Sequence, residues 1–315
     1  MSDIRMFSGL NSALDVSPEK RQAQRSKALL IFFFLAPGFL LLVTFLVIPI
    51  GQAAYYSLYN WNGLGPLDDF VALDNYVRAF SQEVFRGAIQ HSLFIMVLSL
   101  AVQLPLAMTL ALILIRGRLR FQRFFRTLFF LPYVFSEIVA AYIWLYVYNP
   151  RGGLLNVFLG LFNPEINGTA WLADLDTVLV AIFFVLTWKF FGFHMLLYMA
   201  GLQNISREVE DSARVSGANE WQVLRYVTLP MMRSTISLSV FLSILGSFQQ
   251  FIVVWILTEG GPAFRSELIV TYLYKFGIQR MQLGFGSALA IILFLMTLIF
   301  SLGYQRTVLR QTLTE

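Results

Sequence analysis

Two charged side chains of this sequence lie well inside long apolar runs, where a bare charge is costly in a membrane. Of 23 basic and 18 acidic residues, only Glu137 and Lys189 are placed in this way. If consecutive antiparallel helices carry them, each lies about 12 residues, or roughly 18 Å, from the same membrane surface. We therefore expect an ion pair, or two charges that share one wet cavity. Whether they line a substrate path or only hold two helices together stays open.

A second group of polar residues forms a stripe without charge. Ser243, Ser247 and Gln250 recur at i, i+4 and i+7, so a continuous helix would present them on one face. Such a stripe suits a sugar, because hydroxyl groups need donors and acceptors while sugar C–H faces stack on aromatic rings. Hydrogen bonding between helices is the alternative explanation. The nearby aromatic residues are Phe248, Phe251 and Trp255.

Residue types for catalysis are scarce. The sequence has no cysteine, no H-E-x-x-H pattern and no G-x-x-x-x-G-K-[ST] loop, since Gly-Lys does not occur. The two histidines, His91 and His194, are too few for a histidine metal cluster. We expect His194 to be a packed or hydrogen-bonded helix residue. The chain is therefore predicted not to be an enzyme, to bind no metal or cofactor of its own, and to leave any ATP hydrolysis to another polypeptide.

Composition indicates the elements that must position these residues. A mean hydropathy of +0.68, with 57% hydrophobic and 13% charged residues, is typical of an all-α polytopic membrane protein. The net charge of +5 then reflects topology, and nucleic acid is not an expected partner. A polar, loosely ordered tail is expected over 1–27, followed by one membrane domain over 28–315 without internally broken spans. The six expected spans are 29–50, 89–115, 127–149, 177–202, 234–257 and 282–304.

The distribution of Lys and Arg predicts the orientation. Five Arg and no acid lie between Arg116 and Arg126, and the tail carries five basic residues, so both are expected in the cytosol. Segments 51–86 and 149–176 hold three basic residues against seven acids and are expected outside. Both termini and the polar segment 203–233 would then be cytosolic.

The polar stretch Ile205–Pro230 reads as a helix, a break at Gly217 and a second helix that closes at Pro230. Four Arg balance four acids from Ile205 to Arg233. A helix meant only to lie on anionic lipid would be strongly basic. This neutral hairpin instead indicates a surface for a soluble protein.

The same stretch resembles the cytoplasmic coupling (EAA) loop of membrane subunits in binding-protein-dependent ABC importers. The match covers Asp211-Ser212-Ala213, Gly217-Ala218, Trp221 and Val227-Thr228-Leu229-Pro230, with Asp and Ser where the family has Glu and Ala. The resemblance implies docking on an ATPase, with Asp211 accepting hydrogen bonds and Gly217 permitting the bend. The residues expected to couple to the ATPase are Glu210, Asp211, Ser212, Ala213, Gly217, Ala218, Trp221, Leu229 and Pro230.

Further short matches extend the resemblance from about residue 28 to the C-terminus. They resemble the first of two different permease subunits of carbohydrate importers of the maltose or glycerol-phosphate type. The matching segments are PIGQAAYYSLYNW, FVALDNYVRAF, Leu131-Pro132, Tyr148-Asn149-Pro150, Gly152-Gly153 and Thr258-Glu259-Gly260-Gly261-Pro262. The implied partners are a second permease, two ATPase subunits carrying ATP and Mg, an external solute-binding protein, a sugar and the bilayer.

The resemblance also implies a substrate path, because span 5 and the stretch around Trp188 contact the sugar in maltose-type importers. The candidates on this path are Glu137, Lys189, Phe190, Phe193, Ser243, Gly246, Ser247 and Gln250. Lys189 keeps an anionic substrate, such as a phosphorylated polyol, open as an alternative.

Two other classes of function remain as alternatives. The first is a channel or a secondary transporter driven by an ion gradient, which the coupling loop disfavours. The second is a membrane-embedded enzyme, for which Glu137 alone offers an acid at depth.

Overall fold

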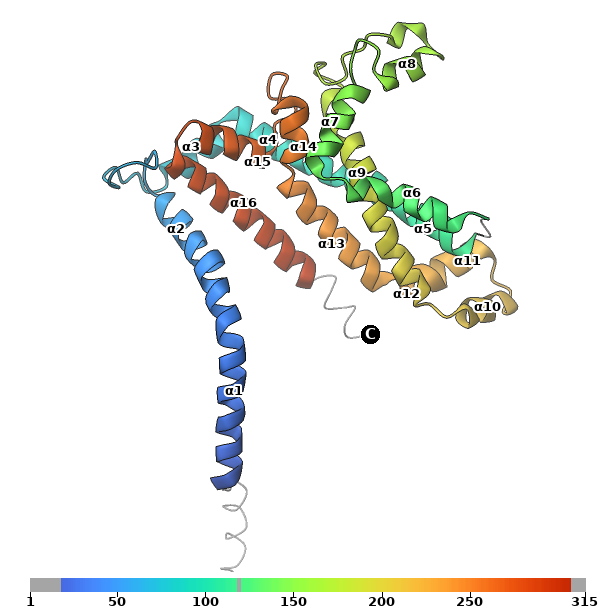
Figure 1. Cartoon of the computed structure of the whole chain (residues 1–315), viewed down its shortest axis with the longest axis horizontal. Coiled ribbons are helices and arrows are strands. Elements are labelled where there is room, and N and C mark those ends of the chain that lie inside the picture. The colour runs from blue at the N-terminus through green and yellow to red at the C-terminus, as the bar shows by residue number, and fades with distance from the viewer. Residues whose placement is uncertain (1–17, 118–119, 307–315) are drawn as a thin grey trace, which may run out of the picture. The chain divides into compact units, whose positions relative to one another are not determined.

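The computed structural model describes residues 18–117 and 120–306, and within these ranges the chain is helical with no β-strand (Figure 1). This confirms the all-α, multi-span fold. The chain divides into two compact units, residues 1–55 and 56–315, which are treated separately below. Residues 1–17 of the predicted tail lie outside the described residues.

The first unit is one long helix with a short π-helical segment. Its elements are α1 (Pro18–Leu42), η1 (Val43–Val47) and α2 (Ile48–Tyr56). Because α1 begins at Pro18, residues 18–27 are helical, and the expectation of a loosely ordered tail is wrong there. Residues Leu30–Tyr56 are long and apolar enough to cross a membrane.

The second unit contains the remaining elements. Its membrane-length helices and their continuations are α4 (Glu83–Leu98), η2 (Ser99–Gln103), α5 (Leu104–Arg116), α6 (Gln122–Val134), α7 (Glu137–Val147), α9 (Val178–Gln203), α13 (Arg233–Gln249), α14 (Ile252–Thr258) and α16 (Leu283–Tyr304). Its shorter elements are α3 (Asp74–Ser81), α8 (Leu154–Gly160), η3 (Pro164–Ile166), α10 (Arg207–Val215), α11 (Glu220–Val223), η4 (Leu224–Thr228), α12 (Leu229–Met231), α15 (Ile269–Tyr272) and η5 (Leu273–Gln279).

Within residues 18–117 and 120–306, four single helices meet the length and apolarity of a membrane span, and up to six if each bent pair is one span. The expectation that no span is broken is wrong. In the third predicted span, α6 and α7 meet at 100° across Phe135 and Ser136. Ser136 caps α7 by accepting a hydrogen bond from the Val139 amide, which favours a new helix start at this point. The fifth predicted span also divides, since α13 ends at Gln249 and α14 begins at Ile252.

Helix α9 is the centre of the second unit and contacts α5, α6, α7, α13 and α14. Its N-terminal half joins α7 and α14 in one apolar cluster, around Trp144, Ile182 and Val254. Its other half joins α5 in a second cluster, around Ala107 and Met199. A helix enclosed on most sides loses its polar face, which explains why α9 is apolar all round.

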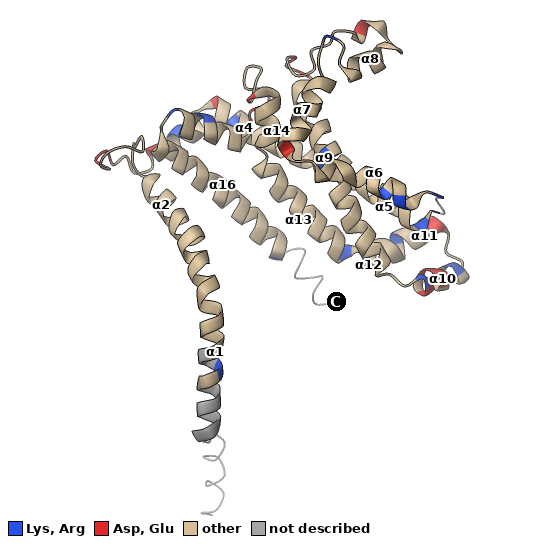
Figure 2. Ribbon diagram, viewed as in Figure 1, with Lys and Arg blue, Asp and Glu red and all other residues tan. Residues whose placement is uncertain are grey.

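Charged residues are concentrated at the ends of the helices of this unit (Figure 2). One concentration covers α10 and α11, while the bodies of α13 and α16 carry almost none. The ends of the bundle are therefore the surfaces suited to water and to soluble partners.

Candidate functional site

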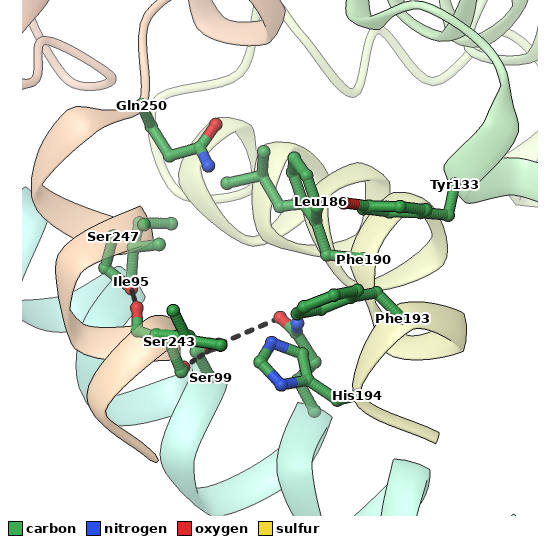
Figure 3. Close-up of a pocket in the computed structure, with 13 residues that line it drawn as sticks. Ile95, Ser99, Tyr133, Leu186, Phe190, Phe193, His194, Ser243, Ser247 and Gln250 are labelled. Carbon is green, nitrogen blue, oxygen red and sulfur yellow. Dashed lines mark hydrogen bonds between the residues drawn. The ribbon is translucent and has the colours of Figure 1, made fainter. Parts of the chain in front are cut away.

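A cavity of about 220 Å³ lies among η2, α6, α9 and α13 (Figure 3). Four separate stretches of sequence contribute to its wall. The lining residues are Ile95, Ser99, Gln103, Tyr133, Leu186, Phe190, Phe193, His194, Leu242, Ser243, Gly246, Ser247 and Gln250. None of these is acidic, and none is Lys or Arg, so the wall is polar on one side without a fixed charge.

The polar side is a hydrogen-bonded row between two helices. Ser243 Oγ donates to Ser99 Oγ at 2.9 Å, and Ser99 Oγ donates to Gln103 Oε1 at 2.9 Å. Ser247 Oγ donates to the Ser243 carbonyl, also at 2.9 Å. Gln250 points toward the cavity in Figure 3, and its buried Oε1 has no hydrogen-bond partner within the described chain. That oxygen is an acceptor suited to a ligand hydroxyl.

The opposite side is aromatic. The rings of Tyr133 and Phe193 are stacked, with centroids 5.0 Å apart, and Phe190 meets Tyr133 edge-on at 6.3 Å. Next to them, His194 Nδ1 lies 2.8 Å from Ser239 Oγ, which confirms the prediction of a hydrogen-bonded helix histidine. The hydroxyl groups on one wall can form hydrogen bonds with the hydroxyl groups of a sugar. The aromatic rings on the other wall can stack on its C–H faces.

Six of the eight residues predicted for the substrate path meet at this cavity: Phe190, Phe193, Ser243, Gly246, Ser247 and Gln250. Their expected arrangement on one continuous helical face is wrong for Gln250. Helix α13 ends at Gln249, and Gln250 has an extended backbone, so it reaches the cavity from the first residue beyond the helix.

Glu137 and Lys189 do not line the cavity, and no ion pair joins these two described residues. Lys189 Nζ instead donates to the carbonyl oxygens of Tyr133 and Phe135, at 2.8 and 2.6 Å. Glu137 is the first residue of α7. The hypothesis of a direct pair is therefore wrong, whereas the two charges still lie close enough to interact electrostatically. The sequence gives no sign of the break that places backbone carbonyls in front of Lys189.

The sequence interpretation missed Ser99, Gln103 and Tyr133 among the lining residues. Ser99 and Gln103 are four residues apart in an otherwise apolar run, the same spacing as Ser243 and Ser247. A search for a second polar stripe would have found them. Tyr133 carries no comparable signal, because it stands among other aromatic and apolar residues of α6.

The predicted coupling residues lie on α10, the turn after it, α11 and α12. Asp211, Ser212 and Trp221 are exposed, and Trp221 keeps 64% of its surface accessible. Gly217 has φ +93°, a left-handed geometry that ends α10 and that other residues adopt only with strain. Asn219 and Gln222 then form a capping box at the start of α11. Helix α12 ends at Met231, one residue beyond the predicted stop at Pro230.

Glu210 differs from its neighbours because it faces inward. It is 3% exposed, and its Oε1 accepts from Arg116 at 2.6 Å and from Thr228 Oγ1 at 2.9 Å. Arg116 is the last residue of α5 and Thr228 the last of η4. One buried carboxylate thus joins α10 to the second span and to the helix that leads into α13.

Arg214 holds the two helices of the hairpin together on the exposed side. It pairs with Asp211 and Glu220, each at 2.7 Å. The Arg214 hydrogen bond lowers the pKa of the Glu220 carboxyl from its ordinary value of 4.5. The hairpin is therefore a preformed surface whose shape depends on ionised acids.

Comparisons with known proteins agree with this arrangement. Residues 103–314 match the family described as binding-protein-dependent transport system inner membrane component. The probable ABC transporter permease protein YurN of Bacillus subtilis is 34% identical over 272 residues, covering 86% of this chain and 93% of that protein. The diacetylchitobiose uptake system permease protein NgcF of Streptomyces coelicolor is 27% identical over 295 residues, covering 90% of this chain and 83% of that protein.

A solved structure has the same fold. It is a crystal structure of a bacterial alginate ABC transporter in complex with an alginate pentasaccharide-bound periplasmic protein. One chain of it matches with a TM-score of 0.80 and 22% identity, covering 92% of this chain and 97% of that chain. The family match spans more than half of the chain, and YurN exceeds 30% identity over most of it. This chain therefore belongs to the family of inner membrane components of binding-protein-dependent transport systems.

Proposed function

We propose that this chain is one of two different permease subunits of an ATP-driven importer for an uncharged sugar or related polyol. The cavity carries the proposal, because a row of hydroxyl and amide groups faces a stacked aromatic wall. Protein pockets for small molecules usually enclose about 300–1,000 Å³. At about 220 Å³ the cavity is small for a complete site, which supports a second subunit that supplies the rest.

The position of Lys189 supports an uncharged substrate. Its ammonium is bonded to two backbone carbonyls and is absent from the cavity wall, so it offers no positive charge to an anionic substrate there. The names of relatives support the sugar class, since NgcF is named for diacetylchitobiose uptake and the solved transporter for alginate. Alginate is an acidic polysaccharide, so this neighbour supports a sugar but not its lack of charge.

The partners follow from the hairpin and the family. An external solute-binding protein would deliver the sugar, and two ATPase subunits holding ATP and Mg would contact α10 and α11 from the cytosol. Their closure would move Asp211, Gly217, Trp221 and Pro230, and the buried Glu210 would pass that motion to α5. The cavity would then open alternately to each side by rigid-body rotation.

The test is purification of the tagged chain from its native membrane, followed by ATPase and uptake assays with candidate binding proteins. A second permease and an ATPase subunit should co-purify. Gly217→Pro should abolish sugar-stimulated hydrolysis, because Pro fixes φ near −65° whereas this position has φ +93°. Gly217→Asn, which tolerates left-handed geometry, is the matched control and should retain it. Uptake that continues after ATP depletion would favour the secondary transporter instead.

A further inference from the structure

The ammonium of Lys189 lies at the break in the third span. Its side chain is almost fully buried, with 3% exposed, and Nζ donates to the carbonyls of Tyr133 and Phe135. The final carbonyl oxygens of a helix receive no hydrogen bond from an amide of the same helix. Tyr133 is in the last turn of α6, and Phe135 lies just beyond it. Two such oxygens without donors inside a membrane would each be energetically costly.

Close packing of α6 on α9 makes this contact possible. Gly192 lies one turn beyond Lys189 on α9, and a Cβ there would collide with the Phe129 carbonyl oxygen. The backbone of α6 therefore rests directly on α9. The Lys189 ammonium also lies 5.2 Å from the Tyr133 ring centre and 5.5 Å from that of Phe190. A lysine on α9 can thus reach the end of α6 and the aromatic wall at once.

The charge of Lys189 is offset by the carbonyl oxygens, by the negative end of the α6 dipole and by the electrostatic attraction of Glu137. In ion-coupled transporters, unwound carbonyls and half-helix ends of this kind hold a free cation. Here the cation is covalently attached to the protein. The break is therefore stabilised without an ion from solution.

We propose that Lys189 is a positioning residue that fixes the break between α6 and α7 and so holds Tyr133 against Phe193 in the cavity wall. Its effect on transport rests on the function proposed above. Its effect on the geometry of the break does not rest on that function, so either proposal can be disproved without the other.

The geometry is tested by distance measurement in the assembled complex. Because the chain has no cysteine, spin labels can be placed only at Phe124→Cys on α6 and Tyr146→Cys on α7, both exposed. Lys189→Met should broaden the distance distribution between the labels, because Met has similar length but no donor. Thr187→Val, which keeps the size of a buried side chain two residues away on α9 and leaves the lysine contacts in place, is the matched control and should keep the native distribution.

Transport supplies the second readout. Lys189→Met should lower sugar uptake at least about tenfold, since two buried acceptors lose their partners. In Lys189→Ala, ethylammonium should restore part of the uptake and narrow the label distances, whereas tetramethylammonium, which has no N–H donor, should not. If Lys189→Met does not assemble, Lys189→Gln, which keeps an N–H donor, is measured in its place and should lie between wild type and Lys189→Ala.

Unchanged label distances in every assembled variant would overturn the proposal, whatever happens to uptake. Reduced uptake with a native distance distribution would mean that Lys189 acts on the sugar directly. If the wild-type complex moves no sugar, the proposed substrate is wrong, but the distance measurement still decides the role of Lys189.

Discussion

Gly246 is a position at which the cavity leaves room for a substitution. It lines the cavity, and a Cβ added there would meet no atom within 4 Å. Larger side chains would therefore occupy the space proposed for the sugar without displacing the protein.

We expect Gly246→Leu to lower sugar uptake at least about tenfold while the complex still assembles, because the added side chain fills the path. Gly246→Ala, with one added carbon, should stay close to wild type. The measurement is uptake of labelled sugar into proteoliposomes, with assembly checked by co-purification. Equal uptake in both variants would place the path elsewhere.

The exposed ion pairs of the hairpin should respond to acid. Because the pKa of Glu220 is depressed in the folded hairpin, its pair with Arg214 stabilises the hairpin above the ordinary pKa of 4.5 and is lost as pH falls through the lower, folded pKa. Amide exchange in residues 207–223 should therefore be faster in Glu220→Gln than in wild type at pH 7. At pH values below the folded pKa the two proteins should exchange alike. A difference that persists in acid would contradict this assignment.

Among elements, the buried contact between α5 and α10 is the connection best placed to carry motion. Arg116 and Glu210 come from positions 94 residues apart, so the pair fixes the hairpin to a span that does not adjoin it in sequence. Removal of one partner from a buried pair costs more than the loss of an exposed pair.

Glu210→Gln should lower the sugar transported per ATP hydrolysed by roughly threefold or more, since the carboxylate that joins three helices is lost. Glu208→Gln, on the same helix but exposed, is the control and should change the ratio little. Arg116→Gln should lower the ratio as well, and the double variant should be no worse than either single one. Additive losses would show that the two residues act independently.

Proline positions explain where three of the π-helical segments occur. Each of Pro49, Pro105 and Pro230 follows a π-helical segment by two residues, after η1, η2 and η4. A proline lacks an amide donor and its ring crowds the carbonyl four residues earlier, so a widened turn before it lets the helix continue. This accounts for α12 extending past Pro230, and for η2 bringing Ser99 and Gln103 to the cavity.

These elements show what could be predicted from sequence. Apolar length and charge spacing were enough to predict the helical spans, because both act within one segment. Six residues that line the cavity were also predicted to lie together, since polar and aromatic residues in a buried helix are conspicuous. The break at Phe135 and the partner of Glu210 depend on contacts between distant segments. No local sequence pattern indicates such contacts. Lys189 was therefore assigned the wrong partner, and Arg116 was assigned none.

In the whole molecule, the cavity, the broken span and the hairpin form one connected series within the second unit. Tyr133 links the cavity to the break, and α9 runs from Lys189 to the start of the hairpin at Ile205. A movement of α10 would therefore reach the aromatic wall through α9 as well as through α5. Both routes consist of packed helices, which transmit small displacements because they resist compression.

The uncharged wall of the cavity has an electrical consequence. Each elementary charge carried through 100 mV costs or yields about 2.3 kcal/mol. If the sugar is neutral and Lys189 stays bonded to its carbonyls, the transport step moves no charge across the membrane. Uptake into proteoliposomes should then be the same with and without an imposed potassium diffusion potential. A rate that follows the voltage would mean that Lys189 or Glu137 moves through the field. A voltage-insensitive importer keeps working in a depolarised cell for as long as ATP remains.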